Sequence, residues 1–344
     1  MKTLEEITEI ERLTAPLGTL ARTEVLARAD EGGLSLPIYK VTFGTTDPAA
    51  PVLGLVGGVH GLERIGAQVC VSLLNSLSQL VLWDRNTQSV LEKVRVFFIP
   101  TVNPWGILTK HRCNPGGVDL MRNAPVEALG KVPWMLGGQR YSRRLPWYRG
   151  ENGAPLQPEA QALVSAVEKE IRHSPLSITV DFHSGFGLQD RIWFPYAKTV
   201  EPYPDVGLMH SFTNLLERTY PHHFYRIEPQ AVNYTTHGDL WDYLYDRHLE
   251  AKAAGPYLPL AVEMGSWNWV KKNPFQFFSA DGSFNPVKRH RLRRVLRRHN
   301  TFFEFLLRAI SSPEAWANLN EEQKMKHQER ALQLWYAHLN GVTP

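Results

Sequence analysis

Four short apolar runs constrain the fold of this chain more than any other feature of its sequence. They are VLGLV at 52–56, VRVFFI at 94–99, SITVDF at 177–182 and LPLAV at 258–262. Near-continuous apolar runs of this length are typical of strands that are buried on both faces. Helical patterns lie near 63–81, 157–172, 205–219 and 237–248. Strands that alternate with helices predict an α/β fold, with a mixed, mostly parallel twisted sheet covered by helices on both faces.

The remaining segments suggest how the chain is divided. Residues 102–155 are rich in Gly, Pro and Asn, which predicts long loops. A long amphipathic helix is expected at 287–310, and a Ser-Ser-Pro sequence follows it. We therefore predict one main domain over 1–312 and a C-terminal helical extension, 313–344, packed on it.

Composition limits the compartment and the classes of partner. The chain of 344 residues has two cysteines, Cys70 and Cys113, too few for a disulfide framework or an all-cysteine zinc site. Its acidic start lacks the apolar run of a secretory signal, and no stretch approaches 18 uninterrupted apolar residues. The formal net charge of +4 does not by itself indicate nucleic acid. We expect a cytoplasmic protein without a membrane span.

Side chains that can bind a metal or carry a proton follow three of the apolar runs. His60 and Glu63 follow the first run, His183 follows the third, and Glu263 follows the fourth. Because open α/β sheets bind ligands outside the carboxyl ends of their strands, we expect these side chains to meet there. Taken singly, His60 and Glu63 could be a surface pair, and His183 a core histidine paired with Asp181. Three such strand ends together favour a functional site.

Two imidazoles and a carboxylate suit a catalytic zinc ion, which takes three protein ligands and leaves a fourth position to water. Zinc lowers the pKa of that water, and a second carboxylate can accept its proton during attack on a carbonyl. On this basis His60, Glu63 and His183 are assigned to one Zn²⁺ per chain. Glu263 is assigned to the general base.

Further motifs, between about residues 50 and 270, stand in a fixed order. They are Asn-Pro-x-Gly at 103–106, Arg-x-Asn-x-x-Gly-Val-Asp-Leu-Met-Arg-Asn at 112–123, Pro-Glu-x-x-Ala-Leu at 158–163, Asp-x-His-Ser at 181–184, and Tyr234 with Gly238 and Asp242. The ordered set resembles the zinc carboxypeptidase family related to carboxypeptidase A. Carboxypeptidase A holds zinc with the same ligand types, so the metal assignment is not independent of this resemblance.

The resemblance implies roles for the two arginines of the loop 110–123. Arg112 would polarise the scissile carbonyl and hold the oxyanion. Arg122 would grip a substrate carboxylate through the bidentate geometry that suits arginine, with Asn123 beside it in the binding site. The short sequence separation between Arg112 and Arg122 resembles that in the compact bacterial branch of murein-peptide amidases.

The resemblance also implies which residues surround the substrate. Tyr234 would be the mobile tyrosine that closes over it, and Ser184 and Trp241 would line the pocket. Ordinary packing is the alternative for Tyr234 and Trp241. Beyond the third ligand, Asp190 and Arg191 add a charged pair close to the expected pocket. We expect Arg191 or Asp190 to tune specificity, with a surface ion pair as the alternative.

Two departures from the family pattern bear on the substrate. Met121 replaces the carboxylate-binding Asn, and Leu62 replaces an arginine often found within His-x-x-Glu. Both changes weaken recognition of a free C-terminal carboxylate, whereas Tyr234 has the carboxypeptidase spacing. The leading hypothesis is a metallocarboxypeptidase that hydrolyses a peptide or peptide-like amide. The runner-up is an amidohydrolase of N-acyl amino acids or murein peptides, similar to the succinylglutamate desuccinylase and aspartoacylase relatives.

The helix predicted at 287–310 carries seven Lys and Arg residues between Lys288 and Arg298. A basic row of this kind could bind RNA or acidic lipid, and a non-catalytic basic binding module is the third hypothesis. Such a row is more often the solvated face of an amphipathic helix, so nucleic acid is not the expected partner. The assembly state stays open.

Overall fold

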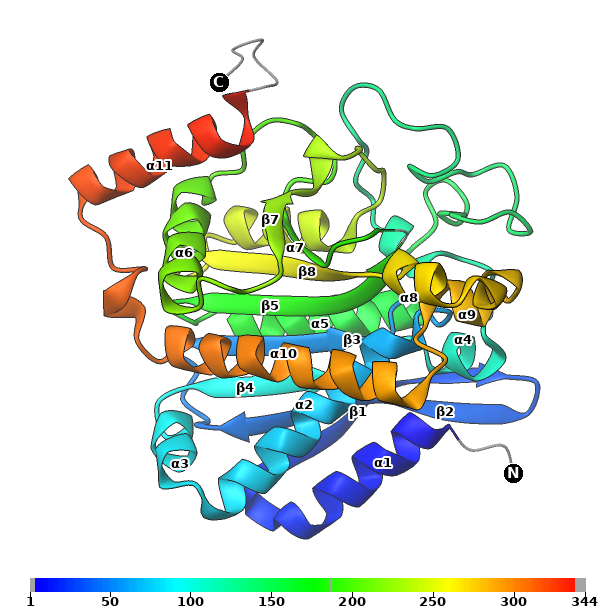
Figure 1. The fold of residues 1–344 in the computed structure, drawn as a ribbon, viewed down its shortest axis with the longest axis horizontal. Helices are drawn as coiled ribbons and strands as arrows, with labels where there is room; N and C mark the ends of the chain where they lie inside the picture. Colours follow the sequence, from blue (N-terminus) through cyan, green and yellow to red (C-terminus); the bar gives the residue numbers. More distant parts are fainter. Residues whose placement is uncertain (1–3, 186, 338–344) are drawn as a thin grey trace.

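A single mixed sheet organises the protein in the computed structural model, which describes residues 4–185 and 187–337. Its strand order is β1-β2-β4-β3-β5-β8-β6-β7 (Figure 1). The strands are β1 (Ala21–Glu31), β2 (Leu34–Gly44), β3 (Val52–Gly57), β4 (Arg95–Ile99), β5 (Ser177–Gly185), β6 (Arg191–Phe194), β7 (Arg226–Pro229) and β8 (Tyr257–Gly265). The central strands β4, β3, β5 and β8 pair in parallel, whereas β1–β2, β2–β4 and β6–β8 pair antiparallel. The predicted α/β class is confirmed.

The four apolar runs form the four central strands, as predicted. Every residue of β3 and β4 is buried, as is nearly all of β5. Burial on both faces removes the need for alternating polar residues, and this is why the runs are nearly continuous. Because β3, β5 and β8 are parallel neighbours, their carboxyl ends meet at one edge of the sheet.

Helices cover both faces of the sheet. Figure 1 shows α2 and α10 in front of it and α5 and α7 behind it. The helices are α1 (Glu5–Thr14), α2 (Arg64–Trp83), α3 (Arg85–Leu91), α4 (Pro104–Thr109), α5 (Pro158–Ile171), α6 (Val206–Thr219), α7 (Leu240–Glu250), α8 (Trp267–Lys272), α9 (Ala280–Phe284), α10 (Arg289–Ile310) and α11 (Glu321–Trp335).

Helix α2 is long and apolar enough to cross a membrane by length and composition, but 61% of its apolar window is buried inside the fold. It is therefore a core helix. A side chain at Gly66 would place its Cβ 2.0 Å from the Phe182 carbonyl oxygen. Glycine at this position lets the first turn of α2 pack closely against β5, beside His183.

Several short elements were not predicted. Strands β6 and β7 have four residues each, too few for a periodic signal, and α3, α4, α8 and α9 have at most seven. The region 102–155 is irregular apart from α4 and a short 3₁₀ turn at Leu120–Arg122, close to the expectation of long loops.

Helix α11 packs on α6 and on the sheet edge. His210 of α6 and His327 of α11 lie with their Nδ1 atoms 2.8 Å apart. The Trp335 indole N–H donates to the Ile227 carbonyl at 3.0 Å, and its ring lies 4.7 Å from that of Phe194. The division into 1–312 and 313–344 stays a prediction, and residues 338–344 lie outside the described part.

Candidate metal centre and catalytic cavity

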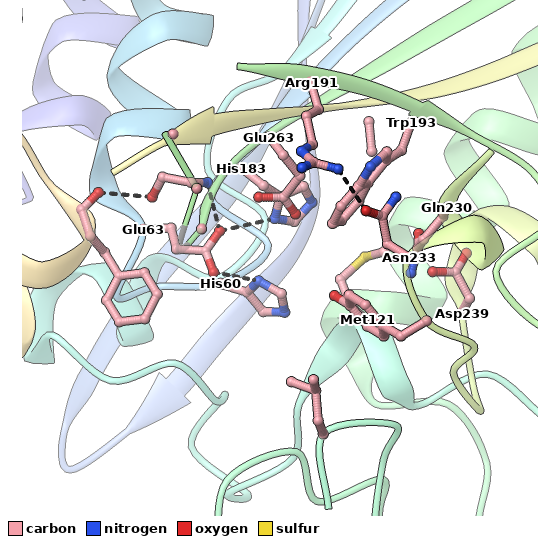
Figure 2. Close-up of a pocket in the computed structure, with 18 of the residues that line it drawn as sticks. His60, Glu63, Met121, His183, Arg191, Trp193, Gln230, Asn233, Asp239 and Glu263 are labelled. Carbon is pink, nitrogen blue, oxygen red and sulfur yellow. Dashed lines mark hydrogen bonds and ion pairs between the residues drawn. The ribbon is translucent and has the colours of Figure 1, made fainter. Parts of the chain in front are cut away.

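His60, Glu63 and His183 form a buried cluster at the carboxyl edge of the sheet. His60 follows β3, Glu63 immediately precedes α2, and His183 lies in β5. One potential ligand atom from each lies within 4.8 Å of the others, and the three residues are 3–5% exposed. Figure 2 shows the Glu63 carboxylate between the two imidazoles. Its Oε1 is 3.0 Å from His60 Nδ1, and its Oε2 is 3.1 Å from His183 Nδ1.

Two aspartates lie next to the Nε2 atoms of the two imidazoles, on the side of each ring opposite Glu63. His60 Nε2 lies 2.9 Å from Asp119 Oδ1, and His183 Nε2 lies 2.6 Å from Asp181 Oδ2. A histidine whose Nε2–H donates to a carboxylate presents the lone pair of its Nδ1 to a metal. The buried His60 Nδ1 lies 3.0 Å from Glu63 Oε1 but forms no hydrogen bond of good geometry among the described residues. These donor atoms fit a zinc ion held by His60, Glu63 and His183.

The electrostatics of the cluster also favour a cation. Burial lowers the pKa of His183, but Asp181 and Glu63 outweigh it and hold that pKa well above its usual value. Burial raises the pKa of Asp119, but the Arg112 guanidinium and His60 outweigh it and hold that pKa well below its usual range. Burial also raises the pKa of Glu63, but the two histidines outweigh it and hold that pKa well below its usual range. Glu63 and Asp119 thus remain charged in a buried site, which is costly without a bound cation or proton.

Glu263 lies in β8, in register with His183 of β5. Gly185 leaves room for this side chain, because a Cβ there would lie 2.9 Å from Glu263 Oε2. Burial, aided by the Glu63 carboxylate and opposed by His183, raises the pKa of Glu263 to about 7. A carboxylate with a pKa near neutral can both accept and return a proton at physiological pH.

A cavity of about 350 Å³ opens in front of the cluster. Ten of its wall residues are labelled in Figure 2: His60, Glu63, Met121, His183, Arg191, Trp193, Gln230, Asn233, Asp239 and Glu263. Arg112, Arg122, Ser184 and Tyr234 also line it. The cavity therefore joins the metal cluster, the candidate base and several polar side chains in one space.

The two loop arginines reach this cavity with different partners. Arg112 donates through Nε to Asp119 Oδ2 at 2.8 Å and through Nη1 to Glu63 Oε1 at 2.9 Å. Arg122 is 5% exposed, and its Nε has no hydrogen-bond partner among the described residues. Close packing fixes its backbone, because a Cβ at Gly238, where φ is +71°, would lie 1.9 Å from the Arg122 carbonyl oxygen. A buried guanidinium with an unused donor favours an anionic ligand.

The family model described as Peptidase_M14, zinc carboxypeptidase, matches residues 21–261. The chain belongs to the zinc carboxypeptidase family. The His60, Glu63 and His183 set is typical of the zinc site of this family, and it is intact. The hypothesis of a non-catalytic module is disfavoured, because the His60, Glu63 and His183 set typical of the family's zinc site is intact.

Individual relatives agree with the family assignment. Carboxypeptidase SOL1 of Arabidopsis thaliana is 32% identical over 77 residues, which cover 22% of this chain and 16% of that protein. The crystal structure of thrombin activatable fibrinolysis inhibitor has a TM-score of 0.61 at 17% identity and covers 90% of this chain and 73% of that one. Carboxypeptidase A from Helicoverpa armigera has a TM-score of 0.63 at 16% identity, over 91% and 72%. At these identities the solved structures show a shared fold.

Two predicted substrate-binding residues do not line the cavity. Asn123 Oδ1 accepts from the Gln157 amide at 2.6 Å, and its Nδ2 donates to the Arg149 carbonyl at 3.1 Å, so the side chain fastens two loops. The Trp241 indole N–H donates to Asp181 Oδ2 at 3.0 Å. Trp241 therefore lies behind the cavity wall and contacts Asp181, the carboxylate that holds His183.

Arg191 and Asp190, the charged pair beyond the third ligand, have different surroundings. Arg191 lines the cavity, forms an ion pair with Glu228 and donates to Asn233 Oδ1 at 2.6 Å. Asp190 is 6% exposed and accepts from the Gly265 amide at 3.0 Å. Of this pair, only Arg191 is therefore placed to meet a substrate.

Sequence reasoning missed several wall residues, notably Trp193, Gln230 and Asp239. Trp193 comes from β6, which was too short to predict, and the buried Nε1 of its indole has no hydrogen-bond partner among the described residues. Asp239 caps α7 by accepting from the amides of Trp241 and Asp242, both at 2.9 Å. The predicted range 237–248 put Asp239 inside the helix, so neither its capping role nor its place in the cavity was predicted.

Proposed function

We propose that this protein is a zinc-dependent metallocarboxypeptidase that hydrolyses a peptide or peptide-like amide next to a C-terminal residue. The observation that carries the proposal is one cavity wall that contains a buried His-Glu-His cluster, a carboxylate with a pKa near 7 and an arginine with an unused buried donor. These are the parts needed to activate water, receive its proton and bind an anionic group.

Zinc held by His60, Glu63 and His183 would supply Lewis acidity beside the scissile carbonyl. Glu263 accepts the proton of the attacking water on its carboxylate and returns it to the leaving amine nitrogen. Arg112, fixed by Asp119, holds negative charge on the carbonyl oxygen as the tetrahedral centre forms. Arg122 binds the carboxylate of the departing residue, and Tyr234 covers the site from the wall formed with Trp193, 6.0 Å from it between ring centroids.

The direct test replaces Glu263 with glutamine, which keeps the shape of the side chain and removes the base. Hydrolysis of a short peptide by Glu263→Gln should fall by about 10² to 10⁴-fold while the zinc content stays unchanged. Glu304→Gln, on the exposed part of α10, is the matched control and should keep full activity. Full activity in Glu263→Gln would refute the proposal.

Met121 favours a second candidate function. It lines the cavity beside Arg122 and has no hydrogen-bond donor, so Arg122 has little help in binding a carboxylate. An amidohydrolase of N-acyl amino acids or murein peptides would need less of that help. Paired peptides with a free or an amidated C-terminus separate the two functions. Equal cleavage of both would favour the amidohydrolase, whereas a strong preference for the free carboxylate, weakened in Arg122→Lys, would favour the carboxypeptidase.

A further inference from the structure

An exposed group of apolar side chains lies on the segment that leads from α8 to α10. Phe275 and Phe278 are 83% and 86% exposed, and Trp267, Phe277 and Val287 are exposed as well. We call these five residues the apolar patch. Phe277 contacts both Trp267 and Phe278, with ring centroids 5.9 and 6.3 Å apart. Exposed apolar side chains gathered on one segment favour an interaction surface, because their exposure to water costs free energy that a partner would recover.

The segment that carries the patch is fastened beside the cavity mouth. The Trp267 ring stacks on Phe277 at 5.9 Å. The Asn285 side chain accepts from the Ile65 amide at 2.8 Å and donates to the Leu62 carbonyl at 2.9 Å, which ties the segment to the start of α2. Phe284, on the same segment, lines the cavity. The patch is therefore a preformed part of the catalytic face.

The charge around the patch is strongly one-sided. Residues 264–303 contain nine Lys and Arg residues and one acidic residue, Asp281, for a net charge of +8. The whole chain carries +4, so the rest of it carries −4. Asp281 pairs with Lys110 at 3.0 Å. Within 4–185 and 187–337, no acidic side chain forms an ion pair with the basic residues that flank the patch, which are Lys271, Lys272, Lys288 and Arg289.

Helix α10 extends this basic surface. Arg289, Arg293 and Arg297 are exposed and spaced by four residues, so they form one row along the helix. Arg291 donates to the carbonyls of Trp269 and Lys272 at 3.0 and 3.2 Å, which fixes the first turn of α10 against the end of α8. Figure 1 shows α10 crossing the front of the molecule with α8 and α9 at its N-terminal end. The basic row therefore begins beside the segment that carries the apolar patch.

We propose that this surface docks the protein on an anionic lipid membrane. Phe275 and Phe278 enter the boundary between headgroups and acyl chains, and the surrounding lysines and arginines meet the anionic headgroups. A lipid surface offers apolar volume and negative charge together. Nucleic acid supplies the charge, but its binding sites combine a groove with stacked rings, and these two phenylalanines project almost fully into solvent.

The test measures co-flotation of the full-length protein with phosphatidylcholine vesicles, with and without phosphatidylserine. Binding is expected only when phosphatidylserine is present, and it should weaken as salt is added. Phe275→Ser with Phe278→Ser should reduce the affinity at least about tenfold, and each of Lys271→Gln and Lys272→Gln about fivefold. Leu82→Ser with Trp83→Ser at the end of α2, and Lys324→Gln with Lys326→Gln on α11, are matched exposed controls that should bind like the unaltered chain.

Thermal melting shows whether each variant is folded, and the exposed positions make a loss of structure unexpected. The proposal is overturned if the chain does not float with phosphatidylserine vesicles, or if the phenylalanine variant floats as well as the unaltered chain. Patch-dependent binding to polyuridylate RNA without flotation would assign the surface to nucleic acid instead. A dimer seen by analytical ultracentrifugation, lost in the phenylalanine variant and without flotation, would assign it to self-association.

Discussion

Two pairs of histidines in this protein have the same geometry and opposite surroundings. The rings of His60 and His183 lie 5.0 Å apart at 59°, and so do those of His210 and His327. Glu63 lies between the first two, and Asp119 and Asp181 hold them from behind. For the second pair, no acidic side chain in the described part of the chain forms an ion pair with either ring.

The pKa values show what this difference does. The carboxylates raise the pKa of His183, whereas burial, His327 and Arg330 lower the pKa of His210 to about 4. Burial, Arg330 and Lys326 lower the pKa of His327 as well. The first pair attracts a cation and the second repels one. The comparison teaches that carboxylates, rather than the spacing of imidazoles, make the metal centre.

Removal of the carboxylate between the first pair should have the largest effect. Glu63→Gln loses a charged ligand, so the zinc content should fall from one per chain to near zero and hydrolysis should be lost with it. His327→Gln, in the second pair, should leave both unchanged. Inductively coupled plasma mass spectrometry of dialysed protein measures this, and stoichiometric zinc in Glu63→Gln would exclude it as a ligand.

Removal of the charge on Asp181, which holds His183, should have a smaller effect on zinc binding. Asp181→Asn keeps the ligands but no longer holds the His183 Nε2–H with a charge, so zinc affinity should fall by about 10 to 100-fold. Trp241→Phe removes one donor to Asp181 and should cost less than Asp181→Asn. Competition with a chelator gives both affinities. If Asp181→Asn bound zinc as tightly as the unaltered chain, the proposed role of the aspartates would be wrong.

The second pair should make stability sensitive to acid. Because folding lowers the pKa of His210 from about 6.5 to about 4, the unfolded chain binds more protons in that range. Its contribution to stability is complete above about pH 6.5 and is lost as the pH falls toward 4. Both rings are partly exposed, so solvent screening limits the effect to about 1 kcal/mol or less.

Urea unfolding at neutral and at mildly acid pH measures this contribution. Other buried histidines also titrate, so the relevant quantity is the difference between the unaltered chain and His210→Gln with His327→Gln. The double variant should lose less stability on acidification. An identical loss in both proteins would contradict the assignment.

A change of charge beside the second pair should have the smallest effect. Arg330→Glu replaces repulsion of His210 and His327 by attraction, so the pKa of each should rise. Histidine NMR titration reports the shift directly, and the variant should still bind no second zinc because a single exposed carboxylate does not complete a site. Unchanged or lower histidine pKa values would contradict the electrostatic account.

The sequence predicted the first pair much better than the second. His60, Glu63 and His183 follow buried strands, so the direction of the strands brings them together before any side-chain detail is known. His210 and His327 meet because α11 folds back on α6, and nothing in either segment indicates that contact. Glu263 was predictable for the same reason as His183, since β8 runs parallel to β5.

Side chains whose place depends on helix rotation or loop packing were not predictable. The family resemblance implies that Trp241 lines the pocket, but in the structure its indole N–H donates to Asp181. Asn123 stands next to Arg122, yet its amide is used by two loops. These outcomes follow from tertiary contacts that local patterns do not encode. Strands β6 and β7 were not predicted because a strand of four residues is too short to show a periodic pattern of apolar residues.

The most direct test of the account is the metal content of the unaltered protein measured together with its activity. The account predicts one zinc per chain, loss of peptide hydrolysis when a chelator removes it, and recovery of hydrolysis when one equivalent of zinc is returned. A dialysed protein that contains no zinc and hydrolyses peptides at an unaltered rate would contradict it.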